Sequence, residues 1–285
     1  MHGSYIRQLR GASVRLMILL LALNIAAGFG ADTGASSTNR LWQKIVMVGA
    51  SASAGFTVME PWGGTNTLGL RLSRYVDAAL IAPHAPVLNL GHALFFLQPE
   101  STGRAQMTRA LAEQPSVLFA VDFLFWFCYG QGTNDTERLQ RFEGGLKLLE
   151  PVTCPLVLGD LPDASASVNK MLLPSQIPSS NALAAANARL RTWAAPRANV
   201  ALVPLSQFMH AVARNEAFSA PGRSWPAGKT RRLLQPDNLH PSADGAAALA
   251  LVALEELRLQ QEFPAQEVRW DAGALVKLVR AAPER

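Results

Sequence analysis

The fold is decided by the stretch "KIVMVGASASAG", residues 44–55. It opens with a short apolar run, which is typical of a fully buried strand in a parallel sheet. It continues on tiny side chains, with hydroxyl groups at two positions only, Ser51 and Ser53. Such a stretch is either a plain turn or the place where a strand displays a nucleophile at the edge of a sheet.

Strand-length apolar runs and helix-like stretches alternate along the rest of the chain. The runs lie at 85–91, 116–126, 155–160 and 199–205, and the helix-like stretches at 67–81, 101–114, 137–150, 181–196 and 241–260. Together with the first strand, they predict a three-layer α/β fold, in which a five-stranded parallel sheet has helices on both faces. Residues 206–235 are rich in Gly, Pro and Arg and predict a long irregular surface excursion.

The first 31 residues differ from the rest. Three arginines lead into the apolar stretch "LMILLLALNIAAGFG", which ends in small residues. Its apolar core is shorter than the roughly 20 residues of a membrane-spanning helix, so residues 1–31 predict a signal peptide or, if uncleaved, an N-terminal anchor. We expect a periplasmic or secreted protein whose only membrane contact is an uncleaved N-terminal segment. Residues 40–262 are expected to form the α/β domain and 263–285 a C-terminal helical extension.

Composition favours a globular protein with one core and argues against nucleic-acid or metal binding. A chain of 285 residues that is 49% apolar can bury one substantial core. The one dense basic cluster, "KTRR" at 229–232, has no aromatic residues between its charges, so no nucleic acid is expected as a partner. His84, His92 and His210 have no partners at metal-ligand spacing, so no metal ion is expected.

Export permits a disulfide between the two cysteines. Cys128 lies near the end of one predicted strand, and Cys154 begins the next. In adjacent parallel strands these positions lie at opposite ends of the sheet, beyond the Cα separation of about 7 Å that a disulfide tolerates. Two free thiols are therefore expected.

A second informative stretch, "LLQPDNLHPSADG" at 233–245, places Asp237 and His240 three residues apart before a predicted helix. A serine hydroxyl needs a base to remove its proton, a histidine titrates in the right range, and a carboxylate can orient that histidine. Ser51 follows the first strand, at the sheet edge where sites form in open α/β folds. These three residues are a candidate catalytic triad.

The two stretches resemble the first and last sequence blocks of the SGNH (GDSL-type) serine hydrolase superfamily. "GASASAG" is similar to Gly-Asp-Ser-x-Ser/Thr-x-Gly, and "DNLHPSADG" to Asp-x-x-His-Pro followed by a glycine and a helix. The resemblance implies a flavodoxin-like α/β/α fold and a cofactor-free esterase or lipase that works through an acyl-enzyme. It also implies that Ser51 is the nucleophile, His240 the base and Asp237 the orienting carboxylate.

The middle blocks depart from the family pattern. Ala50 stands where the family has Asp. In the second block, Asn-x-x-x-x-Gly, "NLGHAL" has Asn89 and Gly91 but Leu94 at the expected glycine, five residues after the asparagine. Gly132–Asp135 matches the block Gly-x-Asn-Asp, although it lies farther from the third strand than the family's asparagine. Gly91 and Asn134 are the expected oxyanion donors. Asp122 lies closer to the strand end, but an ionised carboxylate would repel an oxyanion.

Several alternatives remain open at this point. Ser53 is a rival nucleophile, and Asp160 or Asp163 is a rival orienting carboxylate. The pocket is expected to be built from 56–66 and 206–235, with Trp126 and Tyr129 as further wall candidates. The substrate is a small-molecule, glycan or lipid ester. A catalytically inactive envelope protein that binds a ligand with the same fold, or an acyltransferase that uses the same triad, is the competing interpretation.

Overall fold

The computed structural model describes residues 38–132, 134–220 and 223–282, so the predicted signal segment, 1–31, lies outside the described residues. The described part is built on a five-stranded, all-parallel sheet in the order β2-β1-β3-β4-β5. The strands are β1 (Ile45–Met47), β2 (Leu88–Asn89), β3 (Val117–Ala120), β4 (Leu156–Gly159) and β5 (Val200–Val203). The predicted α/β fold class is confirmed.

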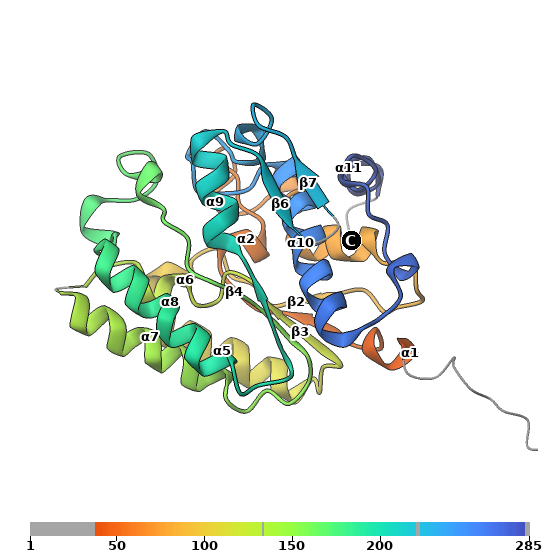
Figure 1. The fold of residues 1–285 in the computed structure, drawn as a ribbon, viewed down its shortest axis with the longest axis horizontal. Coiled ribbons are helices and arrows are strands. Elements are labelled where there is room, and N and C mark those ends of the chain that lie inside the picture. The colour runs from red at the N-terminus through yellow and green to blue at the C-terminus, as the bar shows by residue number, and fades with distance from the viewer. Residues whose placement is uncertain (1–37, 133, 221–222, 283–285) are drawn as a thin grey trace, which may run out of the picture. The chain divides into compact units, whose positions relative to one another are not determined.

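Helices cover both faces of the sheet. Those on one face are α5 (Pro99–Ala112), α7 (Asp135–Leu149) and α8 (Ser180–Ala194); those on the other are α4 (Leu72–Ala79), α10 (Ala243–Gln261) and α11 (Ala272–Ala281). Figure 1 shows α5, α7 and α8 side by side, with the sheet between them and α10. Three short helices lie before α4 in the chain: α1 (Thr38–Leu41), α2 (Ser51–Ala54) and α3 (Thr65–Leu68).

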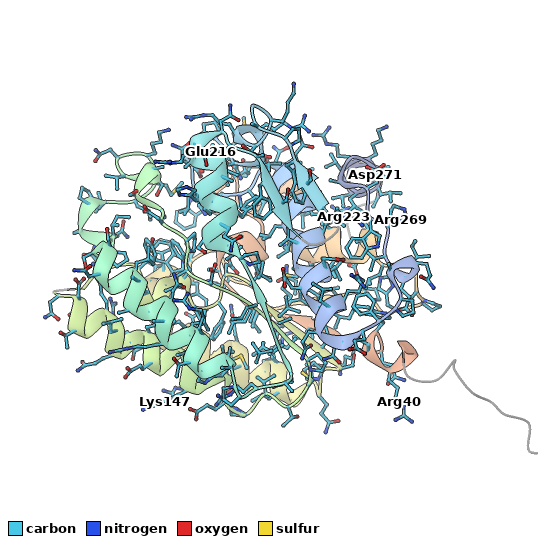
Figure 2. All side chains as sticks on the ribbon, in the orientation of Figure 1. Arg40, Lys147, Glu216, Arg223, Arg269 and Asp271 are labelled. Atoms are coloured by element: carbon cyan, nitrogen blue, oxygen red, sulfur yellow. The ribbon has the colours of Figure 1, made fainter. Side chains whose placement is uncertain are left out.

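Alternation along the strands explains why two apolar layers form. Ile45 and Met47 of β1 join the core under α4 and α10, whereas Val46 joins the core under α5 and α7. Because successive strand residues point to opposite faces, a run that is apolar throughout buries both faces of the sheet. Charged side chains lie at the periphery, as Figure 2 shows for Arg40, Lys147 and Glu216.

The third strand is shorter than predicted. The apolar run at 116–126 forms a strand only to Ala120, after which the chain turns and enters α6 (Phe125–Cys128). All four residues of α6 are buried. The run is therefore apolar because it is buried, and apolarity alone does not separate a buried strand from a buried turn and helix.

The expected irregular excursion at 206–235 is wrong in part. It contains most of α9 (Leu205–Arg214), the antiparallel strands β6 (Phe218–Ala220) and β7 (Arg223–Trp225), and a 3-10 turn at Arg231–Leu233. The helix buries Leu205, Phe208 and Val212, which follow the spacing of one helical face. This face packs on the core beside the carboxyl end of the sheet.

The two cysteines are free thiols, as predicted, but only Cys128 is fully buried, and Cys154 is half-buried. Burial raises the pKa of each to about 11. The C-terminal segment predicted as a helical extension contains α11, whose Leu275 and Val279 are buried in the core shared with α4 and α10. Among the described helices, none combines the length and apolarity that crossing a bilayer requires.

Two neighbouring glycines in the middle of α7 offer a test of this packing. A Cβ at Gly144 would meet nothing within 4 Å, whereas one at Gly145 would lie 2.7 Å from the Phe127 ring. We expect Gly144→Ala to raise the free energy of unfolding by about 0.5–1 kcal/mol, because alanine favours the helix. We expect Gly145→Ala to lower it by about 1–3 kcal/mol through overpacking. Urea denaturation of both variants measures the difference, and equal effects would contradict the packing of α7 on α6.

Candidate active site

The structure brings Ser51, His240 and Asp237 together. Ser51 begins α2 directly after the turn that ends β1, and the other two lie in the loop before α10. His240 Nε2 is 2.9 Å from Ser51 Oγ, and His240 Nδ1 is 2.7 Å from Asp237 Oδ2. All three residues are less than one tenth exposed. The contact joins segments 189 positions apart in the chain.

The loop that carries the imidazole is shaped by Asp237 itself. Its Oδ1 accepts hydrogen bonds from the backbone N–H groups of Leu239, at 2.9 Å, and His240, at 3.0 Å. The same carboxylate thus closes the turn through one oxygen and bonds the ring through the other. Spacing of three residues is what allows both contacts, because a tight turn returns the third amide to the first side chain.

Phe56 and Gln235 also hold the imidazole in place. The Phe56 ring stacks on the His240 ring, with centroids 3.9 Å apart and an angle of 24° between the planes. The Gln235 side-chain amide donates to the Phe56 carbonyl at 2.6 Å and to the Pro241 carbonyl at 2.9 Å. The segment after the nucleophile and the segment around the histidine are therefore tied to each other.

The charge state of Asp237 follows from its neighbours. Burial opposes ionisation, but the hydrogen bond and charge of His240 and the two backbone N–H donors outweigh it, so the pKa of Asp237 lies below its ordinary value. An ionised carboxylate only accepts hydrogen bonds, so the shared proton lies on Nδ1 of His240. Nε2 then carries the lone pair that faces the Ser51 hydroxyl.

Asp122 fixes the turn that carries Ser51. Its Oδ1 accepts from the Ala50 N–H at 3.0 Å and the Ser53 hydroxyl at 2.6 Å, and its Oδ2 from the N–H groups of Ala52 and Ser53 at 2.8 and 3.2 Å. Burial raises the pKa of Asp122, while these four donors favour its charged form. The donors on either side of Ser51 are bound by one carboxylate from the turn that follows β3.

This arrangement leaves one amide of the turn available. Among the described residues, the Ser51 N–H donates to no acceptor, whereas its neighbours Ala50 and Ala52 donate to Asp122. Gly91 packs against the turn, since a Cβ there would lie 2.8 Å from the Ala54 nitrogen. Its N–H donates to Asn89 Oδ1 at 2.8 Å, so it already has an acceptor.

Asn134, the other expected oxyanion donor, lies elsewhere. It is exposed, caps the N-terminus of α7, and accepts a hydrogen bond from the Glu137 N–H at 2.9 Å. It is absent from the residues that line the cavity beside Ser51. Asn134 therefore has a capping role here, and the polar residue that directly follows β3 is Asp122. The placement follows from the early end of β3, which the sequence did not show.

The rival residues also have other partners. The Ser53 hydroxyl donates to Asp122 rather than to an imidazole. Asp160 accepts hydrogen bonds from the Ser206 backbone N–H, at 2.7 Å, and from the Ser206 hydroxyl. Asp163 is exposed and accepts from the Ser165 N–H at 2.8 Å. Asp237 is thus the carboxylate that faces His240.

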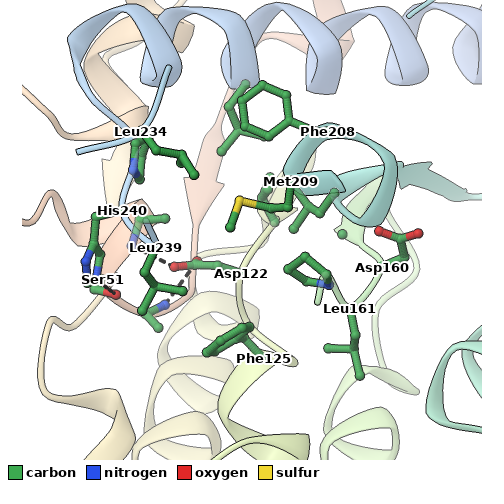
Figure 3. Close-up of a pocket in the computed structure, with 18 of the residues that line it drawn as sticks. Ser51, Asp122, Phe125, Asp160, Leu161, Phe208, Met209, Leu234, Leu239 and His240 are labelled. Atoms are coloured by element: carbon green, nitrogen blue, oxygen red, sulfur yellow. Dashed lines mark hydrogen bonds between the residues drawn. The ribbon is translucent and has the colours of Figure 1, made fainter. Parts of the chain in front are cut away.

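A cavity opens beside Ser51 and His240, and Figure 3 shows both at one side of it. Its walls come from the ends of β3 and β4, from α9 and from the loop that carries His240. Trp126 lines it as predicted, whereas Tyr129 lies outside it in the core, bonded to the Pro162 carbonyl at 2.6 Å. Of the two predicted wall segments, 206–235 contributes through α9, but 56–66 does not.

No protein-family model matches this chain, and no curated protein matches it in sequence. Its structure is similar to that of the lipase/acylhydrolase from Enterococcus faecalis, with a TM-score of 0.52 and 16% identity over 80% of this chain and 98% of that chain. The likeness is one of fold, and an α/β/α fold is what the resemblance to the SGNH (GDSL-type) hydrolases implies.

Two further structures are similar at lower scores. A GDSL-like lipase from Parabacteroides merdae has a TM-score of 0.46 and 17% identity, over 76% of this chain and 96% of that chain. An acetylxylan esterase from Geobacillus stearothermophilus has a TM-score of 0.43 and 15% identity, over 80% and 96%. At these identities the likeness concerns the fold.

The residues that sequence reasoning missed are those that support the triad. The sequence argues against Asp122 as an oxyanion donor but does not predict that it accepts hydrogen bonds from the turn that carries Ser51. The sequence did carry a signal for the role of Asp122, because Asp122 lies closer to the expected end of the third strand than Asn134 does. Phe56 and Gln235 carry no signal in a single sequence, because stacking and backbone bridging need the loop geometry.

Asp122→Asn tests the clamp on the nucleophile turn. An amide has one acceptor oxygen, and its NH₂ group would face N–H donors, so the turn must shift. We expect kcat/KM for an ester to fall roughly tenfold to a hundredfold and the free energy of unfolding to fall by about 1–3 kcal/mol. Asp163→Asn, the same change at an exposed position, is the matched control. Parental kcat/KM in Asp122→Asn would show that the clamp does not position Ser51.

Proposed function

We propose that this protein is a serine ester hydrolase that works through an acyl-enzyme. The observation that carries the proposal is the connected series from Ser51 Oγ through His240 to Asp237, buried at the edge of a cavity. A histidine with one nitrogen on a carboxylate and the other on a serine hydroxyl is the arrangement that activates such a hydroxyl. The fold shared with the lipase/acylhydrolase is consistent with it.

In the first half-reaction, Ser51 Oγ attacks the ester carbonyl carbon while His240 Nε2 takes the hydroxyl proton. The carbonyl oxygen becomes an oxyanion, for which we propose the Ser51 N–H as one donor, because it has no acceptor among the described residues. The tetrahedral intermediate then collapses. Its bond to the alcohol oxygen breaks, and the alcohol leaves with the proton from Nε2.

In the second half-reaction, water attacks the acyl carbon and gives a proton to Nε2. The bond to Ser51 Oγ then breaks, the carboxylic acid departs, and the serine regains its proton from His240. Asp237 stays ionised throughout and stabilises the imidazolium that forms twice per turnover. His240 Nε2 accepts or donates the proton in every proton transfer of this scheme.

We also propose that the chain is exported. The support is the N-terminal pattern of arginines, a short apolar core and small residues at 1–31. An exported hydrolase would meet esters of the envelope or of the surrounding medium.

The test of the proposed function is hydrolysis of p-nitrophenyl esters by the full-length protein and its variants. Ser51→Ala and His240→Ala should each lower kcat by roughly a thousandfold or more, because the triad acts as a unit. Ser101→Ala and His210→Ala, which change exposed residues on α5 and α9, serve as controls. Hydrolysis that survives either triad substitution would refute the assignment.

A further inference from the structure

The cavity beside the triad has two distinct ends. Ser51 and His240 lie at one end, and Asp160 and Leu161 at the other, with Met209 between them (Figure 3). Most of its lining residues are apolar, and they include Val121, Phe125, Trp126, Phe208, Met209 and Leu234. A chemical group that enters the cavity from the side of Ser51 is therefore transferred from water to an apolar environment.

The polar groups of the lining are already bonded. Asp122 accepts four hydrogen bonds from the nucleophile turn, and Asp160 accepts two from Ser206. A sugar ring in the cavity would lose its hydration and find few free partners, which is costly for each hydroxyl. An anionic tail would meet two carboxyl groups. A neutral hydrocarbon avoids both costs and gains from burial.

The cavity is also small. Its volume, measured as the space open to the centre of a water-sized sphere, is about 70 Å³. One water needs roughly 10–15 Å³ by the same measure, so the space suits a group of a few carbon atoms.

The far wall is fixed before any ligand arrives. Asn187 holds Leu161 by two hydrogen bonds of 2.8 Å, one to its N–H and one to its carbonyl, and Tyr129 donates to the Pro162 carbonyl. Asp160 binds Ser206 at the start of α9, which joins this wall to the helix that carries Met209. A preformed pocket lowers the ordering cost of binding.

We propose, on the basis of the proposed function, that this cavity holds the acyl group of the substrate, and that the protein acts on esters of short, neutral aliphatic acids longer than acetate. The acyl group stays attached to Ser51 between the half-reactions, whereas the alcohol must leave to solvent. The apolar cavity beside Ser51 therefore fits the acyl group. Specificity for the alcohol lies outside this cavity.

The test is kcat/KM of the full-length protein for p-nitrophenyl acetate, butyrate, hexanoate and octanoate. Each methylene that becomes fully buried multiplies kcat/KM by about fourfold, so butyrate, with two more methylenes than acetate, should exceed it about fifteenfold. The gain should stop once the cavity is full. Met209→Trp fills the space and should lower the ratio of hexanoate to acetate at least tenfold. Leu259→Trp, at an exposed position on α10 outside the cavity, should keep the parental ratio.

Leu161→Ala lengthens the cavity and should shift the highest kcat/KM to an ester with a longer acyl chain. If Met209→Trp does not fold, this second variant tests the acyl pocket. A parental ratio in a folded Met209→Trp, or no shift in Leu161→Ala, would overturn the acyl pocket. Equal kcat/KM across the series, with hydrolysis still dependent on Ser51, would overturn the acyl pocket but keep the proposed function. No Ser51-dependent hydrolysis of any ester would overturn both.

Discussion

The hydrogen bond between Ser51 Oγ and His240 Nε2 is the contact on which the candidate site depends. It joins the turn after the first strand to the loop before α10, and both lie at the carboxyl edge of the sheet. The sheet order places β1 in the interior, between β2 and β3, so the nucleophile turn is supported from both sides. The imidazole is fixed in turn by Asp237, by the Phe56 ring and by the backbone bridge from Gln235.

Asp122 shows how a carboxylate can serve such a site without touching the reaction. Its two oxygens accept the donors that flank Ser51, so the turn keeps its shape and the Ser51 amide is left available. The same negative charge would oppose an oxyanion placed close to it. Burial raises the pKa of Asp122, while the four donors stabilise its charged form. The position is thus a compromise between holding the nucleophile and accommodating the intermediate.

Much of this structure could be predicted from the sequence, because its signals are local. The run at 44–50 and the spacing of Asp237 and His240 depend on a few neighbouring residues, and the α/β alternation depends on periodicity. The end of β3 could not be predicted, because the buried turn after Ala120 is as apolar as the strand. The helix α9 was missed although Leu205, Phe208, Met209 and Val212 follow helical spacing, because Gly, Pro and Arg farther along dominated the segment. Both errors fell at the carboxyl edge, where the site is built.

The most direct test of the account is to locate the covalent adduct of a fluorophosphonate on the full-length protein by mass spectrometry of its peptides. Such a reagent labels a serine only when a base activates it. The account predicts one adduct, on Ser51, that forms quickly in the parent protein and at least a hundredfold more slowly in His240→Ala. An adduct on another serine, or labelling of Ser51 at the same rate without the imidazole, would contradict it.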